Sequence, residues 1–243
     1  MKKNVLLLAL SSVIITQPVL AKDKPKYGLS GAGEAGYANT TGNVVSESLY
    51  AALKADYKQT DYRLKSLIEA KNKSEDKVAT EERYVGEVQT DWFLNAYPQA
   101  YGFGQVRLEN DRFVDIDLTA FVLAGFGYSF FDEKNLVLST ELGLGRQSTG
   151  YTQKSGQKDI NQTIIKGSAN FEYGFNDQVR FLQDVAVYSG SDQMQYETNT
   201  GLKVKLNGSL SLKANYKIRY NDTPAVGSVN KDTETFLTLI YDF

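Results

Sequence analysis

The stretch Leu210-Ser-Leu-Lys-Ala-Asn-Tyr-Lys-Ile-Arg-Tyr220 alternates between two kinds of side chain at every residue. Its even positions are leucine, alanine, tyrosine and isoleucine, whereas its odd positions are Ser211, Lys213, Asn215, Lys217 and Arg219. Successive side chains of a β-strand point to opposite faces, so the pattern predicts a strand with one apolar face and one charged face. The segment before it alternates in the same way, with apolar Leu202, Val204 and Leu206 set against Gly201, Lys203 and Lys205.

The same alternation recurs along most of the chain after Ala21. Clusters of glycine, asparagine and aspartate interrupt it at intervals, and such clusters are typical of the turns between strands. The pattern therefore predicts about twelve strands, an even number. They are expected near residues 27–38, 44–57, 61–74, 81–93, 100–110, 116–130, 135–148, 160–175, 178–189, 194–206, 209–221 and 232–243.

Strands with one apolar face are typical of barrels that span the outer membrane of bacteria. Lipid offers the backbone no hydrogen-bond partners, so a spanning sheet must close on itself. We therefore expect an all-β fold, a closed antiparallel transmembrane β-barrel of about 12 strands, with charges pointing into the lumen. Residues 101–109 and 118–130 are apolar on both faces in places, and the pattern does not orient them.

The last predicted strand ends on an aromatic residue. Leu237, Leu239, Tyr241 and Phe243 share one face, and Phe243 is the final residue. This arrangement resembles the assembly signal of outer-membrane proteins, which implies the barrel assembly machinery as a partner. The alternative is an ordinary amphipathic strand of a soluble β-protein.

The first residues have the features of an export signal. Lys2 and Lys3 precede an apolar run from Val5 to Ile15, and the small residues Val19 and Ala21 follow it. This order predicts a signal peptide over residues 1–21, cleaved after Ala21, and a barrel domain over residues 22–243. The expected location is the cell outer membrane. The alternative interpretation, a membrane anchor, requires a longer apolar run.

The composition excludes several kinds of chemistry. The 243 residues contain no cysteine and no histidine, so thiol chemistry and imidazole-based triads are absent. The formal net charge of -2 does not indicate nucleic-acid binding. The carboxylates Glu87 and Asp91 remain as a candidate pair for an enzyme without histidine, although such residues are ordinary on a lumen wall. We predict no catalytic residue, no metal ligand and no cofactor.

The face opposite the apolar one carries both signs of charge. The candidate lumen residues are Glu34, Lys54, Arg63, Glu69, Glu141, Lys166, Lys203, Lys213, Lys217 and Arg219. Barrels of about eight strands are filled by their side chains, whereas barrels of about 16 or more strands leave a wide channel. A barrel of twelve strands is intermediate between these two classes. Its lumen is either a narrow polar pore or a space closed by ion pairs. The basic residues on the two strands near 194–221 either favour small anions or are neutralised by carboxylates across the lumen.

Aromatic residues near the predicted strand ends are candidates for the girdles at the membrane surfaces. They are Tyr27, Tyr37, Tyr57, Trp92, Phe130, Phe175, Tyr220 and Tyr241, and ordinary strand packing is the alternative for each. Acidic residues gather at 74–82 and at Asp111, Asp115 and Asp117. These either bind divalent cations that bridge lipopolysaccharide or are solvated loop charges.

Two motifs carry a family resemblance. One is Glu34-Ala-Gly-Tyr-Ala-Asn-Thr-Thr-Gly-Asn43, which leads into the strand from Ser46 to Tyr57, and the other is Tyr101-Gly-Phe-Gly-Gln-Val-Arg-Leu-Glu-Asn-Asp-Arg-Phe113. Together they resemble the YdiY-like family of salt-induced outer-membrane proteins, which contain a domain of unknown function. The resemblance implies an outer-membrane location and a link to osmotic stress, but no catalytic residues.

Three functions are compatible with the sequence. The first is a non-enzymatic barrel in the envelope, with a structural or small-channel role. The second is a soluble periplasmic β-barrel that binds a ligand, and the third is an outer-membrane enzyme that does not use histidine. The first implies outer-membrane lipid, lipopolysaccharide and small solutes or ions as partners, and no nucleic acid.

Overall fold

The computed structural model describes residues 27–40, 46–76, 78–112, 115–152, 156–224 and 229–243. The predicted signal peptide at 1–21 lies outside these residues. Among the described residues, no helix is both long and apolar enough to cross a membrane.

The described chain forms twelve β-strands. They are β1 (Gly28–Thr40), β2 (Ser46–Lys58), β3 (Tyr62–Glu75), β4 (Val78–Leu94), β5 (Tyr97–Asp111), β6 (Ile116–Glu133), β7 (Leu136–Tyr151), β8 (Ile160–Gly174), β9 (Val179–Gly190), β10 (Met194–Lys205), β11 (Leu210–Asn221) and β12 (Lys231–Asp242).

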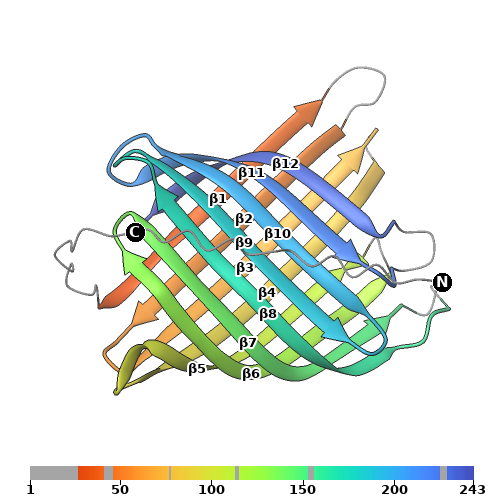
Figure 1. The fold of residues 1–243 in the computed structure, drawn as a ribbon. Coiled ribbons are helices and arrows are strands. Elements are labelled where there is room, and N and C mark those ends of the chain that lie inside the picture. Colours follow the sequence, from red (N-terminus) through yellow and green to blue (C-terminus); the bar gives the residue numbers. More distant parts are fainter. Residues whose placement is uncertain (1–26, 41–45, 77, 113–114, 153–155, 225–228) are drawn as a thin grey trace, which may run out of the picture.

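Each strand pairs with the next one in an antiparallel manner, and β12 pairs with β1 to close the barrel (Figure 1). The predicted fold, a closed antiparallel β-barrel of about 12 strands, is therefore confirmed. The strands also lie where the alternation predicts them, with ends that differ by no more than three residues. The short connections after β2, β4, β6, β8 and β10 lie at the end of the barrel where β1 begins and β12 finishes.

One turn differs from the prediction. The sequence pattern places a connection at residues 94–99, but only Asn95 and Ala96 separate β4 from β5. Leu94 still pairs with Tyr97 because the register shifts by a bulge after Phe93. Proline donates no backbone hydrogen bond, but it is tolerated in the first residues of a strand, and Pro98 occupies that position in β5.

The outer surface of the barrel is apolar. On β11, Leu212 and Tyr216 are exposed, whereas Ser211, Lys213 and Asn215 at the alternate positions are buried. Seven of the eight predicted girdle aromatics are exposed on this surface, and Tyr220 is half-buried because its ring stacks on Tyr196, with centroids 5.0 Å apart. An apolar exterior around a polar interior reverses the arrangement of soluble proteins, and it is the arrangement that a lipid environment requires.

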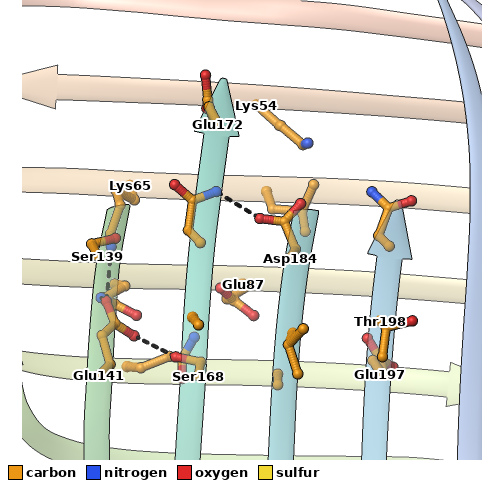
Figure 2. A pocket seen from close by; sticks show the side chains of 18 of the residues that line it. Lys54, Lys65, Glu87, Ser139, Glu141, Ser168, Glu172, Asp184, Glu197 and Thr198 are labelled. Atoms are coloured by element: carbon orange, nitrogen blue, oxygen red, sulfur yellow. Dashed lines mark hydrogen bonds and ion pairs between the residues drawn. The ribbon is translucent and has the colours of Figure 1, made fainter. Parts of the chain in front are cut away.

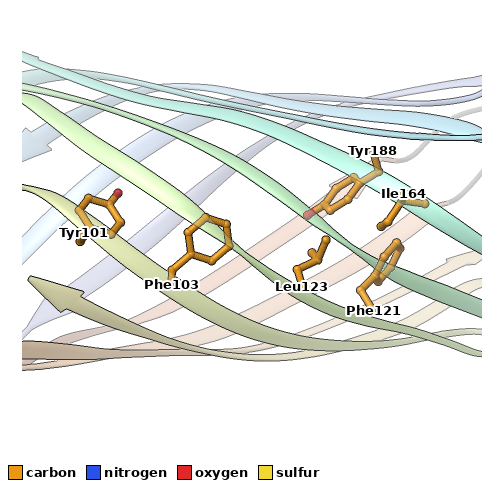
Figure 3. Packing of buried hydrophobic residues seen from close by; sticks show 6 residues of the cluster. All are labelled: Tyr101, Phe103, Phe121, Leu123, Ile164 and Tyr188. Carbon is orange, nitrogen blue, oxygen red and sulfur yellow. The ribbon is translucent and has the colours of Figure 1, made fainter.

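The two segments that the pattern does not orient contribute large apolar side chains to the interior. Tyr101 and Phe103 of β5 and Phe121 and Leu123 of β6 are almost completely buried, and they pack with Ile164 of β8 and Tyr188 of β9 (Figure 3). Their outward neighbours include Gly102 and Gly104 of β5. The alternation is weak here because the interior of this wall is as apolar as its exterior. The cluster fills part of the lumen.

Candidate functional site

The ten predicted lumen residues all lie on the inner face of the barrel wall. Seven of them line one internal cavity, namely Lys54, Arg63, Glu69, Glu141, Lys166, Lys213 and Lys217. Arg219 lines a second cavity. Glu34 contacts Lys213, and Lys203 lies directly opposite Lys213 in the sheet, on the same face. The candidate site of this protein is therefore its lumen.

An arginine at the centre of the lumen holds three carboxylates. Arg83 of β4 is 2 % exposed, and it donates to Glu69 (2.9 Å), Glu109 (2.7 Å) and Glu197 (3.1 Å). Glu197 belongs to β10. β4 and β10 are six strands apart in a ring of twelve, so the bond between Arg83 and Glu197 crosses the barrel from wall to wall. The pair restricts the lumen between β4 and β10.

A second arginine strengthens this crossing. Arg107 of β5 donates to Glu87 at 3.1 Å and to Glu197 at 3.3 Å, and its Nη2 lies 3.4 Å from Glu109. Two guanidinium groups and four carboxylates thus form one network. Buried charges are tolerated only where they are paired and hydrogen-bonded, and this network meets that condition. We call it the central network (Arg83, Arg107, Glu69, Glu87, Glu109 and Glu197).

Another group of charges lies nearer to the end of the barrel that holds the short turns. Glu141 accepts hydrogen bonds from Lys65 (3.2 Å), Gln89 (2.7 Å) and Lys166 (2.9 Å). Figure 2 shows Glu141 beside Ser168, with Lys65 reaching toward it from the opposite wall. Lys65 lies on β3 and Glu141 on β7, so this contact also spans the lumen.

The proposed enzyme pair does not form a free dyad. Asp91 is fully buried, and its carboxylate contacts Arg63 at 2.7 Å and Lys65 at 3.2 Å. Glu87 is bound by Arg107 instead. Each carboxylate is thus held by a cation. In the described part of the chain, no three acidic side chains are grouped so that they could hold a metal ion.

Four of the five basic residues of β10 and β11 are neutralised by carboxylates, whereas Lys205, the last residue of β10, is exposed. Lys213 lies 2.7 Å from Glu34, and Lys217 lies 3.2 Å from Glu69. Lys203 contacts Asp242 at 2.8 Å, and Arg219 contacts Glu234 at 2.8 Å and Glu81 at 3.2 Å. The sequence leaves open whether these basic residues favour small anions or are neutralised by carboxylates. In the structure, these four residues are neutralised by carboxylates.

Two cavities remain between these networks. The first has a volume of about 530 Å³ and is lined by seven basic and eight acidic side chains. The second has a volume of about 450 Å³ and lies toward the opposite end, next to Lys71, Glu81 and Arg219. Tyr50 and Phe236 line both cavities, with ring centroids 4.9 Å apart. The lumen is therefore divided into two polar chambers.

Four members of the central network, Arg83, Arg107, Glu109 and Glu197, are not among the candidate residues predicted from the sequence. Arg83 shares the parity of Glu87 and Asp91 in its strand, and Glu197 shares that of Lys203, so the alternation could have identified both. Arg107 and Glu109 lie in β5, where the apolar cluster conceals the parity. The convergence of all four side chains depends on contacts across the barrel, which no local pattern records.

The acidic loop residues are also partly neutralised. Glu75 contacts Lys73 at 2.6 Å, and Glu82 contacts Arg112 at 3.1 Å. Lys77 lies outside the described residues. These contacts favour ordinary loop charges over a cation site at 74–82.

The fold resembles outer-membrane barrels of known structure. The COG4313 outer membrane channel from Pseudomonas putida F1 has a TM-score of 0.53 and 9% sequence identity, over 94% of this chain and 100% of the channel. The NanC porin has a TM-score of 0.51 and 10% identity, over 88% of this chain and 98% of the porin. At such low identity, the likeness concerns the fold alone.

A search of the curated protein sequences found no match. A family model, in contrast, covers most of the chain, from residue 33 to residue 243. It includes all twelve strands except the first residues of β1. The chain therefore belongs to the family described as "Protein of unknown function, DUF481".

Proposed function

We propose that this protein is an outer-membrane barrel that acts as a narrow channel for small ions and solutes. The observation that carries the proposal is the pair of polar chambers inside a barrel with an apolar exterior, separated near the crossing of Arg83 and Arg107 to Glu197. The first chamber has nearly equal numbers of acidic and basic side chains. We therefore expect weak selectivity between anions and cations.

The proposal places the short turns and both ends of the barrel on the periplasmic side, as in other barrels with an even number of strands. Lipid and lipopolysaccharide then surround the apolar exterior, and the barrel assembly machinery inserts the chain. The role of residues 1–21 as an export signal and the link to salt stress belong to the same proposal. The resemblance to the YdiY-like proteins supports that link, and the family described above has no assigned activity.

Single-channel recording in planar bilayers tests the channel. The wild-type protein is expected to give small, discrete conductance steps. The double variant R107Q/E197Q removes one charge of each sign from the crossing, so the net charge of the lumen is unchanged, although Glu87 loses the cation that binds it. This variant should increase the unit conductance about twofold or more.

The control is R112Q/E82Q, which removes an ion pair between Glu82 of β4 and the exposed Arg112 after β5, outside the central network, and should leave the conductance unchanged. If the wild type and both variants are silent over a range of salt concentrations, the channel is refuted and a purely structural role takes its place.

A further inference from the structure

Two carboxylates in the first cavity lack an ion pair. Six of the eight acidic side chains that line this cavity contact a lysine or an arginine, whereas Asp56 and Asp184 do not contact one among the described residues. Asp184 lies on β9, and its Oδ1 accepts a hydrogen bond of 2.7 Å from Asn170 of β8 (Figure 2). This wall of the cavity therefore carries a negative charge that no cation contacts directly.

Two asparagines beside Asp184 have unused acceptors. Asn199 of β10 lies directly opposite Asp184 in the sheet, and Asn215 of β11 lies opposite Gly201, two residues further along β10. The Oδ1 atoms of both asparagines are buried and accept no hydrogen bond in the described chain, and both side chains line the cavity. Asn215 is only 2% exposed. A buried acceptor without a partner is destabilising, so these oxygens favour a ligand that supplies donors.

A glycine leaves room beside these acceptors. Gly201 is buried on the inner face of β10, and a Cβ at this position would lie 3.5 Å from Asn215 Oδ1. The same Cβ would lie 3.5 Å from Leu182 Cδ1 and 3.5 Å from Lys213 Cδ. These are ordinary van der Waals distances, so the glycine leaves a hollow about as large as a methyl group. Asn215 Oδ1 borders this hollow.

The cavity also offers a loosely held cation. Lys54 of β2 is five strands away from β9 in the ring, so it approaches from the far side of the lumen. Its Nζ lies 3.5 Å from Glu34, whose carboxylate is bound more closely by Lys213 at 2.7 Å. Among the seven basic residues that line the cavity, Lys54 has the longest ion-pair contact and, at 47%, the most exposed side chain. It also interacts electrostatically with Asp184. Lys54 can therefore bind a further carboxylate.

We propose that the first cavity binds small zwitterions, namely amino acids that carry a primary ammonium group and a carboxylate. The ammonium group donates its three hydrogens to Asp184, Asn199 and Asn215. The carboxylate of the ligand contacts Lys54 on the other side of the cavity. The cavity volume of about 530 Å³ is within the usual range for small-molecule sites.

This inference names the class of solute that the first cavity selects, and it rests on the proposed channel only for the route by which that solute enters. Binding to the purified barrel can be measured without any current. A protein that binds zwitterions but conducts no ions would refute the channel alone. A protein that conducts ions but binds no zwitterion would refute this site alone.

Isothermal titration calorimetry of the purified barrel in detergent tests the ligand class. 4-Aminobutyrate and 6-aminohexanoate carry both groups at two spacings. The tighter of them is expected to bind about tenfold or more tightly than n-butylamine or butyrate, because each of these has only one charged group. The N-trimethylated form of the same zwitterion has no N–H donor and should bind as weakly as butyrate. Equal binding of n-butylamine would show a simple cation site and overturn the proposal, as would the absence of binding by both zwitterions.

Substitutions of single charges test where the zwitterion binds. D184N removes the carboxylate without an ion pair and keeps its shape, so it should weaken binding about tenfold or more. D132N is the matched control, because Asp132 lines the same cavity but is paired with Lys58 at 3.4 Å and is exposed. It should change the affinity by less than about twofold. K54Q should weaken binding of the zwitterion and not that of n-butylamine. Equal effects of D184N and D132N would show general attraction by the lumen and refute the site.

G201A tests the hollow without changing any charge. The new methyl group fits at van der Waals distances, so the barrel should fold, but it covers the side of Asn215 Oδ1 that faces the hollow. Binding of the zwitterion should weaken several-fold. The control is G33A, because a Cβ at Gly33 of β1 meets no atom within 4 Å. If G201A and G33A bind the zwitterion equally well, the ammonium group does not lie at Asn215 and the proposed site is wrong.

Discussion

At the scale of single residues, the interior of this barrel depends on how its charges are paired. Arg83 is held by Glu69, Glu109 and Glu197, and almost none of it reaches solvent. A guanidinium group suits this position because its five donors lie in one plane and can serve several carboxylates. A lysine at the same place would present a single point charge and lose part of the network.

Replacing Arg83 with methionine is expected to lower the free energy of unfolding by about 3–5 kcal/mol, because three buried carboxylates lose their shared cation. Urea titration of the protein in lipid vesicles measures this change. R112M is the matched control, since Arg112 is 67% exposed and its pair with Glu82 is worth about 0.2–1 kcal/mol. Equal effects of the two substitutions would show that the central network is not a source of stability.

At the scale of the element, β12 contributes both to the apolar surface and to the closure of the barrel. Its outward residues Leu237, Leu239 and Tyr241 are exposed on the apolar surface, as is Phe243, which follows it. Its last residues also close the barrel through the short pairing with β1. Phe243 contributes to both, because its ring packs over Gly31 and its backbone forms hydrogen bonds with the same residue.

Removal of Phe243 is therefore expected to reduce the amount of assembled barrel several-fold. The folded fraction in outer membranes can be measured by comparing unboiled and boiled samples on a gel. F243A keeps the backbone bonds and removes only the aromatic side chain, so it separates the proposed assembly signal from closure. If F243A assembles as well as the wild type and the deletion does not, the backbone pairing matters and the aromatic signal does not.

At the scale of the whole molecule, the barrel is a thin apolar shell around a charged interior. The ion pairs of the central network and the apolar cluster of β5, β6, β8 and β9 fill much of the lumen. This interior leaves two chambers and not one wide channel. Such an arrangement fits slow passage of small solutes better than general permeability.

Fractionation of cells grown at low and at high salt tests the proposed location and the proposed salt response together. The protein is expected in the outer-membrane fraction, resistant to carbonate extraction, and faster on a gel before boiling than after it. Its amount should rise with salt. Recovery in the soluble periplasmic fraction would contradict the membrane location, and an unchanged amount would contradict the salt response only.

The strands and their faces follow from the sequence alone. Alternation of apolar and charged residues is a local property, so segments such as 202–206 and 210–220 reveal both their structure and their orientation. The alternation does not reveal orientation where the two faces of a strand are alike, as in β5 and β6, because large apolar side chains there fill the interior. It also misplaces the turn before Pro98, since the bulge after Phe93 depends on pairing between strands.

The amino-acid sequence thus decided the charged lumen, the even number of strands and the apolar exterior. Only the tertiary structure decided which charges meet, how the lumen is divided and how far β1 and β12 pair. The physical reason is distance along the chain. Arg83 and Glu197 are brought together by the curvature of a closed sheet, and the length of the seam between β1 and β12 depends on how the ends of the chain meet.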